Sequence, residues 1–126
     1  MSSIELDEFI GRPPAAVWRA LTEPELMGKW WVRGEIKPVV GHRFSLDMGG
    51  WGVQWCEVLD VEPEKLLRYT FAEGSLDTTI TWRLEPEGDG TRLFFVHDGF
   101  EPDSASLHGM KKGWPGIVKR IAFAIP

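Results

Sequence analysis

The sequence has a single cysteine, Cys56, among its 126 residues. One cysteine cannot form an internal disulfide, and the chain therefore fits a reducing compartment. No apolar run approaches the roughly 18 residues that a membrane-spanning helix requires. The N-terminal residues also lack a basic stretch followed by an apolar one, so we expect no signal peptide. Together these absences predict a cytoplasmic protein that does not enter a membrane.

Dense clusters of positive charge are missing as well. The chain has 14 lysine and arginine residues against 19 aspartate and glutamate residues, which gives a net charge of -5 and a pI near 5.2. Proteins that bind nucleic acid need clustered Lys and Arg to neutralise the phosphates. The composition therefore argues against a nucleic-acid partner.

Histidine is scarce, and His42, His97 and His108 lie far apart in the sequence. Together with one cysteine they do not form the closely spaced ligand set of a zinc site. The glycine-rich stretch 49–52 lacks the lysine and the strand–loop–helix context of a phosphate-binding loop. We therefore predict no metal and no cofactor.

Tryptophan, by contrast, is abundant. The chain has seven: Trp18, Trp30, Trp31, Trp51, Trp55, Trp82 and Trp114. Each brings a large apolar surface and one indole N–H that needs a partner when it is buried. The overall composition is that of a globular chain, and its length predicts one domain over residues 1–126. Such a domain has either a thick aromatic core or an aromatic-lined cavity.

The N-terminal part combines a strand with two short helices. Residues 4–10 alternate apolar and acidic side chains, which predicts a half-buried strand. Pro14 can occupy the first turn of a helix, where its missing N–H costs nothing. Thr22 and Glu25 have the spacing of a capping box, with Pro24 between them. They predict the start of a second helix that runs to Trp30 or Trp31.

Between residues 34 and 100 the apolar period changes to two, which predicts about six strands joined by short turns. The clearest stretches are 42–48, 53–61, 67–71, 80–84 and 93–97. The register of residues 51–61 is ambiguous, because Trp55 and Val61 lie on one face whereas Cys56 and Val58 lie on the other. A bulge would let both sets contribute to the core. Short connections between consecutive strands predict an antiparallel sheet.

The C-terminal stretch from Ser104 to Pro126 has the pattern of a helix. Its apolar residues recur at three- and four-residue steps: Leu107, Met110, Trp114, Ile117 and Ile121. Such a stripe needs a sheet to bury it. Pro115 leaves two alternatives open, because proline removes a backbone donor and crowds the preceding turn. Either Pro115 kinks the helix and opens a cavity, or the helix begins there.

The ordered set of motifs resembles a known family. Residues 14–26, followed by Trp30-Trp31, are similar to the opening signature of the heat-shock protein 90 ATPase activator homologue-like family, in the START/Bet v 1-like (SRPBCC) superfamily. Further stretches match in kind: Gly49-Gly50, Glu57-Val58, 67–71, 90–93, 97–100, His108 and Gly113-Trp114. The resemblance implies an α+β helix-grip fold, in which a curved antiparallel sheet wraps around a C-terminal helix. Two short helices near the N-terminus close one end, and a cavity lies between sheet and helix.

Two features depart from that family pattern. The C-terminal helix is short, because the chain ends at Pro126, and the family often has Trp where Phe71 stands. The second departure changes the expected shape of the cavity.

The inward apolar faces form either a packed core or a ligand pocket. A pocket of this kind should be mostly apolar, with a few convergent polar groups. The candidate ligand-binding residues are Trp30, Phe44, Leu46, Trp55, Tyr69, Phe71, Trp82, Phe95, His97, Trp114 and Ile117. Further polar groups that could face the ligand are Gln54 and Glu57. We predict no catalytic residue, and we expect Cys56 to be an inert buried thiol.

These observations lead to one functional hypothesis and two alternatives. The first is binding of a small hydrophobic molecule in an aromatic-lined cavity between the sheet and the final helix. The resemblance also implies a possible regulator of a chaperone ATPase, and the family includes homodimers. The third hypothesis is a cyclase- or hydrolase-type enzyme that uses the same cavity, with His97 and either Tyr69 or Glu57 as an acid–base pair.

Overall fold

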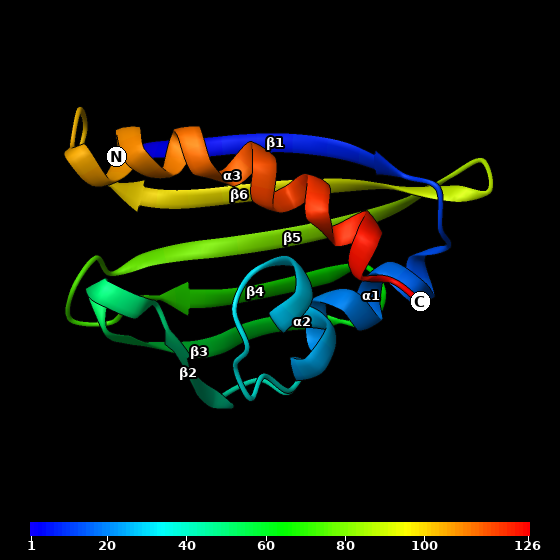
Figure 1. Ribbon diagram of the computed structural model, residues 1–126, viewed down its shortest axis with the longest axis horizontal. Coiled ribbons are helices and arrows are strands. Elements are labelled where there is room, and N and C mark those ends of the chain that lie inside the picture. The colour runs from blue at the N-terminus through cyan, green and yellow to red at the C-terminus, as the bar shows by residue number, and fades with distance from the viewer.

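The computed structural model describes residues 1–126 and contains six strands and three α-helices (Figure 1). In chain order the elements are β1 (Ser2–Ile10), α1 (Pro14–Thr22), α2 (Pro24–Trp30), β2 (Arg43–Asp47), the 3-10 helix η1 (Gly49–Trp51), β3 (Val53–Glu62), β4 (Leu66–Phe71), β5 (Thr78–Glu87), β6 (Gly90–Phe100) and α3 (Ala105–Ala124). Five strands follow the two short helices, so the expectation of about six was too high.

All six strands form one antiparallel sheet in the order β1-β6-β5-β4-β3-β2. The long helix α3 lies across one face of this sheet. The helices α1 and α2 lie on the same face, near the C-terminal end of α3 (Figure 1). The predicted α+β helix-grip architecture is confirmed. One continuous cluster of 28 buried hydrophobic residues fills the space between sheet and helices. No helix combines the length and the apolar character needed to cross a membrane.

The joint between α1 and α2 differs from the predicted capping box. Both helices begin at a proline, as expected, but Glu23 is the N-cap of α2 and makes no side-chain capping bond. Thr22 is the last residue of α1, and its hydroxyl donates to the Trp18 carbonyl at 2.8 Å. Because Thr22 is still part of α1 and Glu23 occupies the N-cap position, Thr22 does not cap α2.

Strand β3 contains the bulge that the ambiguous register suggested. Its pairing with β4 shifts between Val58 and Asp60, which leaves Leu59 as the extra residue. Before the bulge Cys56 and Val58 are buried, and after it Val61 packs against the core. Residues from both of the alternating sets in this stretch therefore contribute to the core.

The bulge also explains why the prediction for Trp55 was wrong. Trp55 lies on the outer face of the sheet, where 46% of its surface is exposed. It pairs with Ser45 of β2, and the Arg43 guanidinium lies 5.6 Å from the centre of its ring. Trp55 therefore does not contribute to an internal cavity.

Helix α3 is continuous through Pro115, so the alternative in which the helix begins at this residue is wrong. The helix begins instead after Ser104, whose hydroxyl oxygen accepts a hydrogen bond from the Leu107 N–H at 3.2 Å. Leu107, Trp114 and Ile121 are buried as the apolar stripe predicted.

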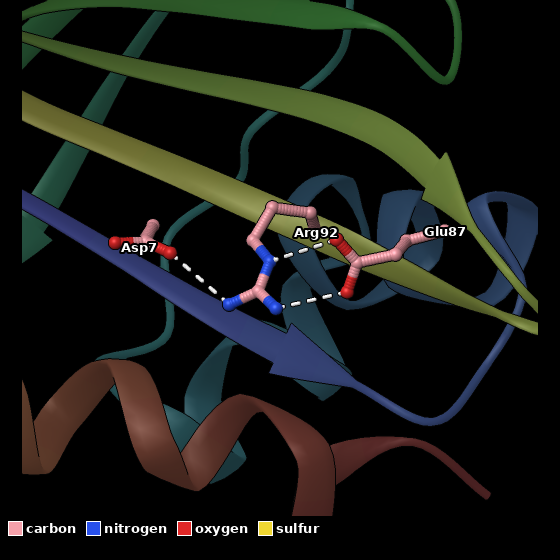
Figure 2. A network of polar contacts seen from close by, with 3 residues as sticks. All are labelled: Asp7, Glu87 and Arg92. Atoms are coloured by element: carbon pink, nitrogen blue, oxygen red, sulfur yellow. Dashed lines mark hydrogen bonds and ion pairs between the residues drawn. The ribbon is translucent and has the colours of Figure 1, made fainter.

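A surface network ties the first strand to the β5–β6 hairpin. The Arg92 guanidinium contacts the Asp7 carboxylate at 3.0 Å and the Glu87 carboxylate at 2.8 Å (Figure 2). These carboxylates are about half exposed, and solvent weakens such pairs. These ion pairs therefore add little to the stability of the pairing between β1, β6 and β5, which rests on the backbone ladder and the buried apolar cluster.

Candidate functional site

A small cavity lies between the sheet and the first half of α3. Its volume is about 160 Å³, and its walls come from α3, the end of β4 and the segments next to α2 and η1. The lining residues are Trp31, Met48, Phe71, Gly109, Met110, Gly113, Trp114 and Ile117. We refer to this space as the α3 cavity.

Three aromatic side chains form much of the wall. The ring centres of Trp31 and Trp114 lie 5.0 Å apart, and those of Trp31 and Phe71 lie 5.7 Å apart. Trp31 reaches this position because it follows α2, which packs against α3. Phe71 points inward because it is the last residue of the alternating strand β4. The aromatic rings thus meet at the junction of three elements.

The glycines Gly109 and Gly113 leave room along the α3 side of the cavity. They are four residues apart, so they lie on neighbouring turns of the same helix face. A Cβ atom placed on either one would meet no other atom within 4 Å. No side chain from either position fills the space at this wall.

A chain of buried polar groups lies behind the cavity wall. The Trp114 indole N–H donates to His97 Nδ1 at 3.0 Å. Because Nδ1 accepts, the proton of the neutral ring is on Nε2, which lies 2.7 Å from the Thr78 hydroxyl. Burial lowers the pKa of His97 from 6.5 to about 3. His97 is therefore neutral at physiological pH, with both ring nitrogens engaged.

The other candidate reactive groups are also inactivated by burial. The Trp82 indole N–H donates to the Tyr69 hydroxyl at 2.9 Å, and desolvation raises the pKa of Tyr69 above its usual value. Burial raises the pKa of the Cys56 thiol to about 12, with a smaller contribution from the charge of Glu73. Both groups are protonated at neutral pH, so neither is poised as a nucleophile or base.

The structure separates the predicted ligand-binding residues into three groups. Phe71, Trp114 and Ile117 line the cavity, whereas Trp55 lies on the outer face. The remaining ones are buried in the core behind the cavity: Trp30, Phe44, Leu46, Tyr69, Trp82, Phe95 and His97. Most of the predicted aromatic set therefore fills the interior, because rings such as Trp82 and Phe95 pack against each other at 4.6 Å.

Five lining residues were missing from the predicted set: Trp31, Met48, Gly109, Met110 and Gly113. Two of them carried a usable signal, since Met48 lies at the end of an alternating strand pattern and Met110 belongs to the apolar stripe of α3. The glycines carried none, because a residue without a side chain has no place in a hydrophobic pattern.

The other polar candidates do not face the cavity as a ligand-binding set. The Gln54 amide donates to the Trp51 carbonyl at 3.1 Å, and Glu57 lies half-buried on β3 outside the lining. No group of three or more His, Cys, Asp or Glu side chains is arranged to hold a metal ion. The lining of the cavity is thus almost entirely apolar.

One family model covers almost the whole chain. The family model described as activator of Hsp90 ATPase homolog 1-like protein matches residues 12–125. The crystal structure of protein MLL2253 from Mesorhizobium loti is similar at 37% sequence identity, with a TM-score of 0.89 over 98% of this chain and 96% of that one. No curated protein matches the chain.

Two solution structures have the same fold. Protein BH1534 from Bacillus halodurans has 25% sequence identity and a TM-score of 0.86, over 100% of this chain and 98% of that one. The Aha1 dimer from Colwellia psychrerythraea has 22% identity and a TM-score of 0.89, over 99% of this chain and 96% of that one. The second likeness concerns the fold alone.

Proposed function

This chain belongs to the family of activator of Hsp90 ATPase homolog 1-like proteins, and from that premise we propose that it binds a small apolar molecule in the α3 cavity. The observation that carries the proposal is the composition of the wall, which consists of six hydrophobic side chains and two glycines without a charge. Ligand sites in proteins are concave and mostly apolar in this way.

Binding is favoured over catalysis because no reactive group is available at the cavity. A general base must offer a free lone pair, but His97 Nδ1 already accepts from Trp114 and does not line the cavity. Tyr69 and Cys56 are held in their protonated forms by burial. The cyclase- or hydrolase-type alternative therefore has no acid–base pair in position.

Replacing Gly113 by alanine is expected to stabilise the protein and to weaken ligand binding. Alanine is favoured over glycine inside a helix by roughly 1 kcal/mol, and the new methyl group meets no atom within 4 Å. Because Gly113 lines the cavity, we expect the methyl group to take up part of its space and to leave less room for a bound molecule. Urea denaturation measures the first effect. The second is measured by the shift in melting temperature that a library of small apolar compounds produces in each variant.

Gly116→Ala is the matched control for this experiment. Gly116 is an exposed residue of the same helix, has open space around its Cβ position and does not line the cavity. Its replacement should raise stability by a similar amount and leave ligand binding unchanged. A wild-type protein that no compound stabilises would contradict the proposed function, since saturation at 100 times the dissociation constant adds about 2.7 kcal/mol.

Partner proteins form a second proposal, favoured by the family description and by an exposed patch on β3. The description names activators of a chaperone ATPase, and the Colwellia psychrerythraea protein is described as a dimer. Val53 and Trp55, which share one face of β3, are 56% and 46% exposed, and tryptophans at such surfaces often carry binding energy. We propose that this patch contacts a chaperone or a second copy in the cytoplasm.

Trp55→Glu tests the patch without disturbing the core. If the patch is an interface, light scattering should give the mass of a dimer for the wild-type protein, or a pull-down should retain the chaperone. The variant should lose whichever contact is present, because a carboxylate replaces an apolar contact. An unchanged mass and unchanged chaperone binding in the variant would show that Trp55 is not part of an interface.

A further inference from the structure

We infer that the ligand of the α3 cavity is a compound with a single aromatic ring whose polar atoms accept hydrogen bonds but do not donate them, such as an aryl ketone, aldehyde or ether. The inference rests on the proposed function, because it concerns the same cavity. Four properties of the site define this class: its volume, its aromatic walls, its lack of charge and the one indole N–H that has no partner.

The volume restricts the ligand to about one ring. The cavity measures about 160 Å³, and an engineered protein cavity of about 150 Å³ holds benzene. Sites for drug-sized ligands are larger, at roughly 300–1,000 Å³. A benzene ring with a short substituent fills this space, whereas most of a sterol or a multi-ring compound would remain outside it.

The walls favour an aromatic ring over a saturated one of the same size. Trp31, Phe71 and Trp114 present ring surfaces, and aromatic pairs are stabilised in edge-to-face and offset arrangements at centroid distances of about 4.5–7 Å. Met48 and Met110 add thioether sulfurs, which also make favourable contacts with aromatic rings. A cyclohexane ring would gain only dispersion contacts from the same wall.

The side chains of the wall can donate hydrogen bonds but have no strong acceptor. The only strong polar atoms on the lining side chains are two indole N–H groups, and that of Trp114 is already bound to His97. The indole N–H of Trp31 makes no hydrogen bond within the protein. Every fully buried side-chain N or O has a partner, so the Trp31 N–H is at least partly exposed. The lining side chains therefore offer at most one strong donor and no strong acceptor.

The ligand's polar groups should match this arrangement. A carbonyl or ether oxygen can accept from Trp31, whereas a hydroxyl or amine would bury its own N–H or O–H without an acceptor. No charged side chain lines the cavity, so an ionised ring compound would lose its hydration without a counter-charge. The compounds that meet these conditions are neutral and aromatic, and their polar atoms accept hydrogen bonds without donating any.

Two matched pairs of compounds test this class by NMR titration, which follows the indole N–H signals. Toluene and methylcyclohexane have the same skeleton but differ in aromaticity. Acetophenone and 1-phenylethanol differ in whether their oxygen only accepts or also donates. We expect toluene to bind more tightly than methylcyclohexane, and acetophenone to bind roughly tenfold more tightly than 1-phenylethanol, because one unpaired donor is left buried by the alcohol.

Trp31→Phe then tests the donor itself. The variant keeps an aromatic ring at this wall but lacks the N–H, so the ratio of acetophenone affinity to toluene affinity should fall, even though the smaller ring changes the affinity for both compounds. The inference is overturned if the alcohol binds as well as the ketone, if methylcyclohexane matches toluene, or if that ratio is unchanged in the variant. Failure of all four compounds to bind the wild-type protein would instead contradict the proposed function.

Discussion

Lowering the pH from 7 to 4 is expected to remove about 3 kcal/mol from the free energy of unfolding through His97. Burial lowers the pKa of His97 to about 3 in the folded protein, against 6.5 in the unfolded chain. Between these values the unfolded chain binds a proton that the folded protein does not. Protons therefore favour unfolding, and stability falls as the pH decreases from about 6.5 towards 3.

The hydrogen bonds around His97 explain why the folded protein rejects this proton. Protonation would place a second N–H on Nδ1, directly opposite the N–H of Trp114 that now donates to it. The Nε2 atom is already paired with Thr78. A charged ring would therefore be buried with one of its donors facing another donor.

The measurement is urea denaturation at several pH values between 4 and 7. His97→Gln removes the titrating ring, so its stability should change less with pH than that of the wild-type protein, by about 3 kcal/mol over this interval. His108→Gln is the control, because it removes an exposed histidine of α3 and leaves His97 in place, so the decrease that comes from His97 should remain. Equal pH dependence in the wild-type protein and in His97→Gln would mean that His97 titrates freely in the folded state.

Replacing Trp82 by alanine is expected to reduce the free energy of unfolding by about 3–5 kcal/mol. Trp82 has no exposed surface, and its ring packs against Trp30, Phe95 and Trp114. The substitution opens a large void and also removes the hydrogen bond to the buried Tyr69 hydroxyl. Both losses act in the same direction.

Trp55→Ala is the matched control, because it removes the same side chain from the outer face. With 46% of its surface exposed, Trp55 should contribute less than about 1 kcal/mol. If Trp82→Ala does not fold, Trp82→Phe keeps most of the packing and should still cost about 1–3 kcal/mol. Equal effects of Trp55→Ala and the Trp82 variant on stability would contradict the assignment of the two faces.

The strand faces could be predicted wherever one face is apolar and the other polar. Tyr69 and Phe71 are inside, as alternation required, and so are Trp82 and Phe95. The prediction failed at Trp55, because the strand around it has apolar residues on both faces and alternation alone cannot choose between them. The choice depends on the bulge at Leu59 and on pairing with β2, which are long-range properties.

The site was less predictable than the fold, because a cavity is the volume that side chains leave unfilled. A periodic pattern identifies which side chains point inward, but not whether they fill the space between them. Trp30 and Phe44 were predicted to line a pocket and instead pack into the core. The open space lies beside Gly109 and Gly113. These residues have no side chain that a hydrophobic pattern could register.

The composition of α3 has a consequence for the order of folding. Its interior contains Gly109, Gly113, Pro115 and Gly116, and each glycine disfavours a helix by about 1 kcal/mol and the proline by about 3 kcal/mol relative to alanine. A helix with this composition does not form in the isolated chain, where even good sequences are marginal. It requires the aromatic face of the sheet as a template. We therefore expect the sheet to assemble first, so that the docking of α3 completes the native state and forms one wall of the cavity.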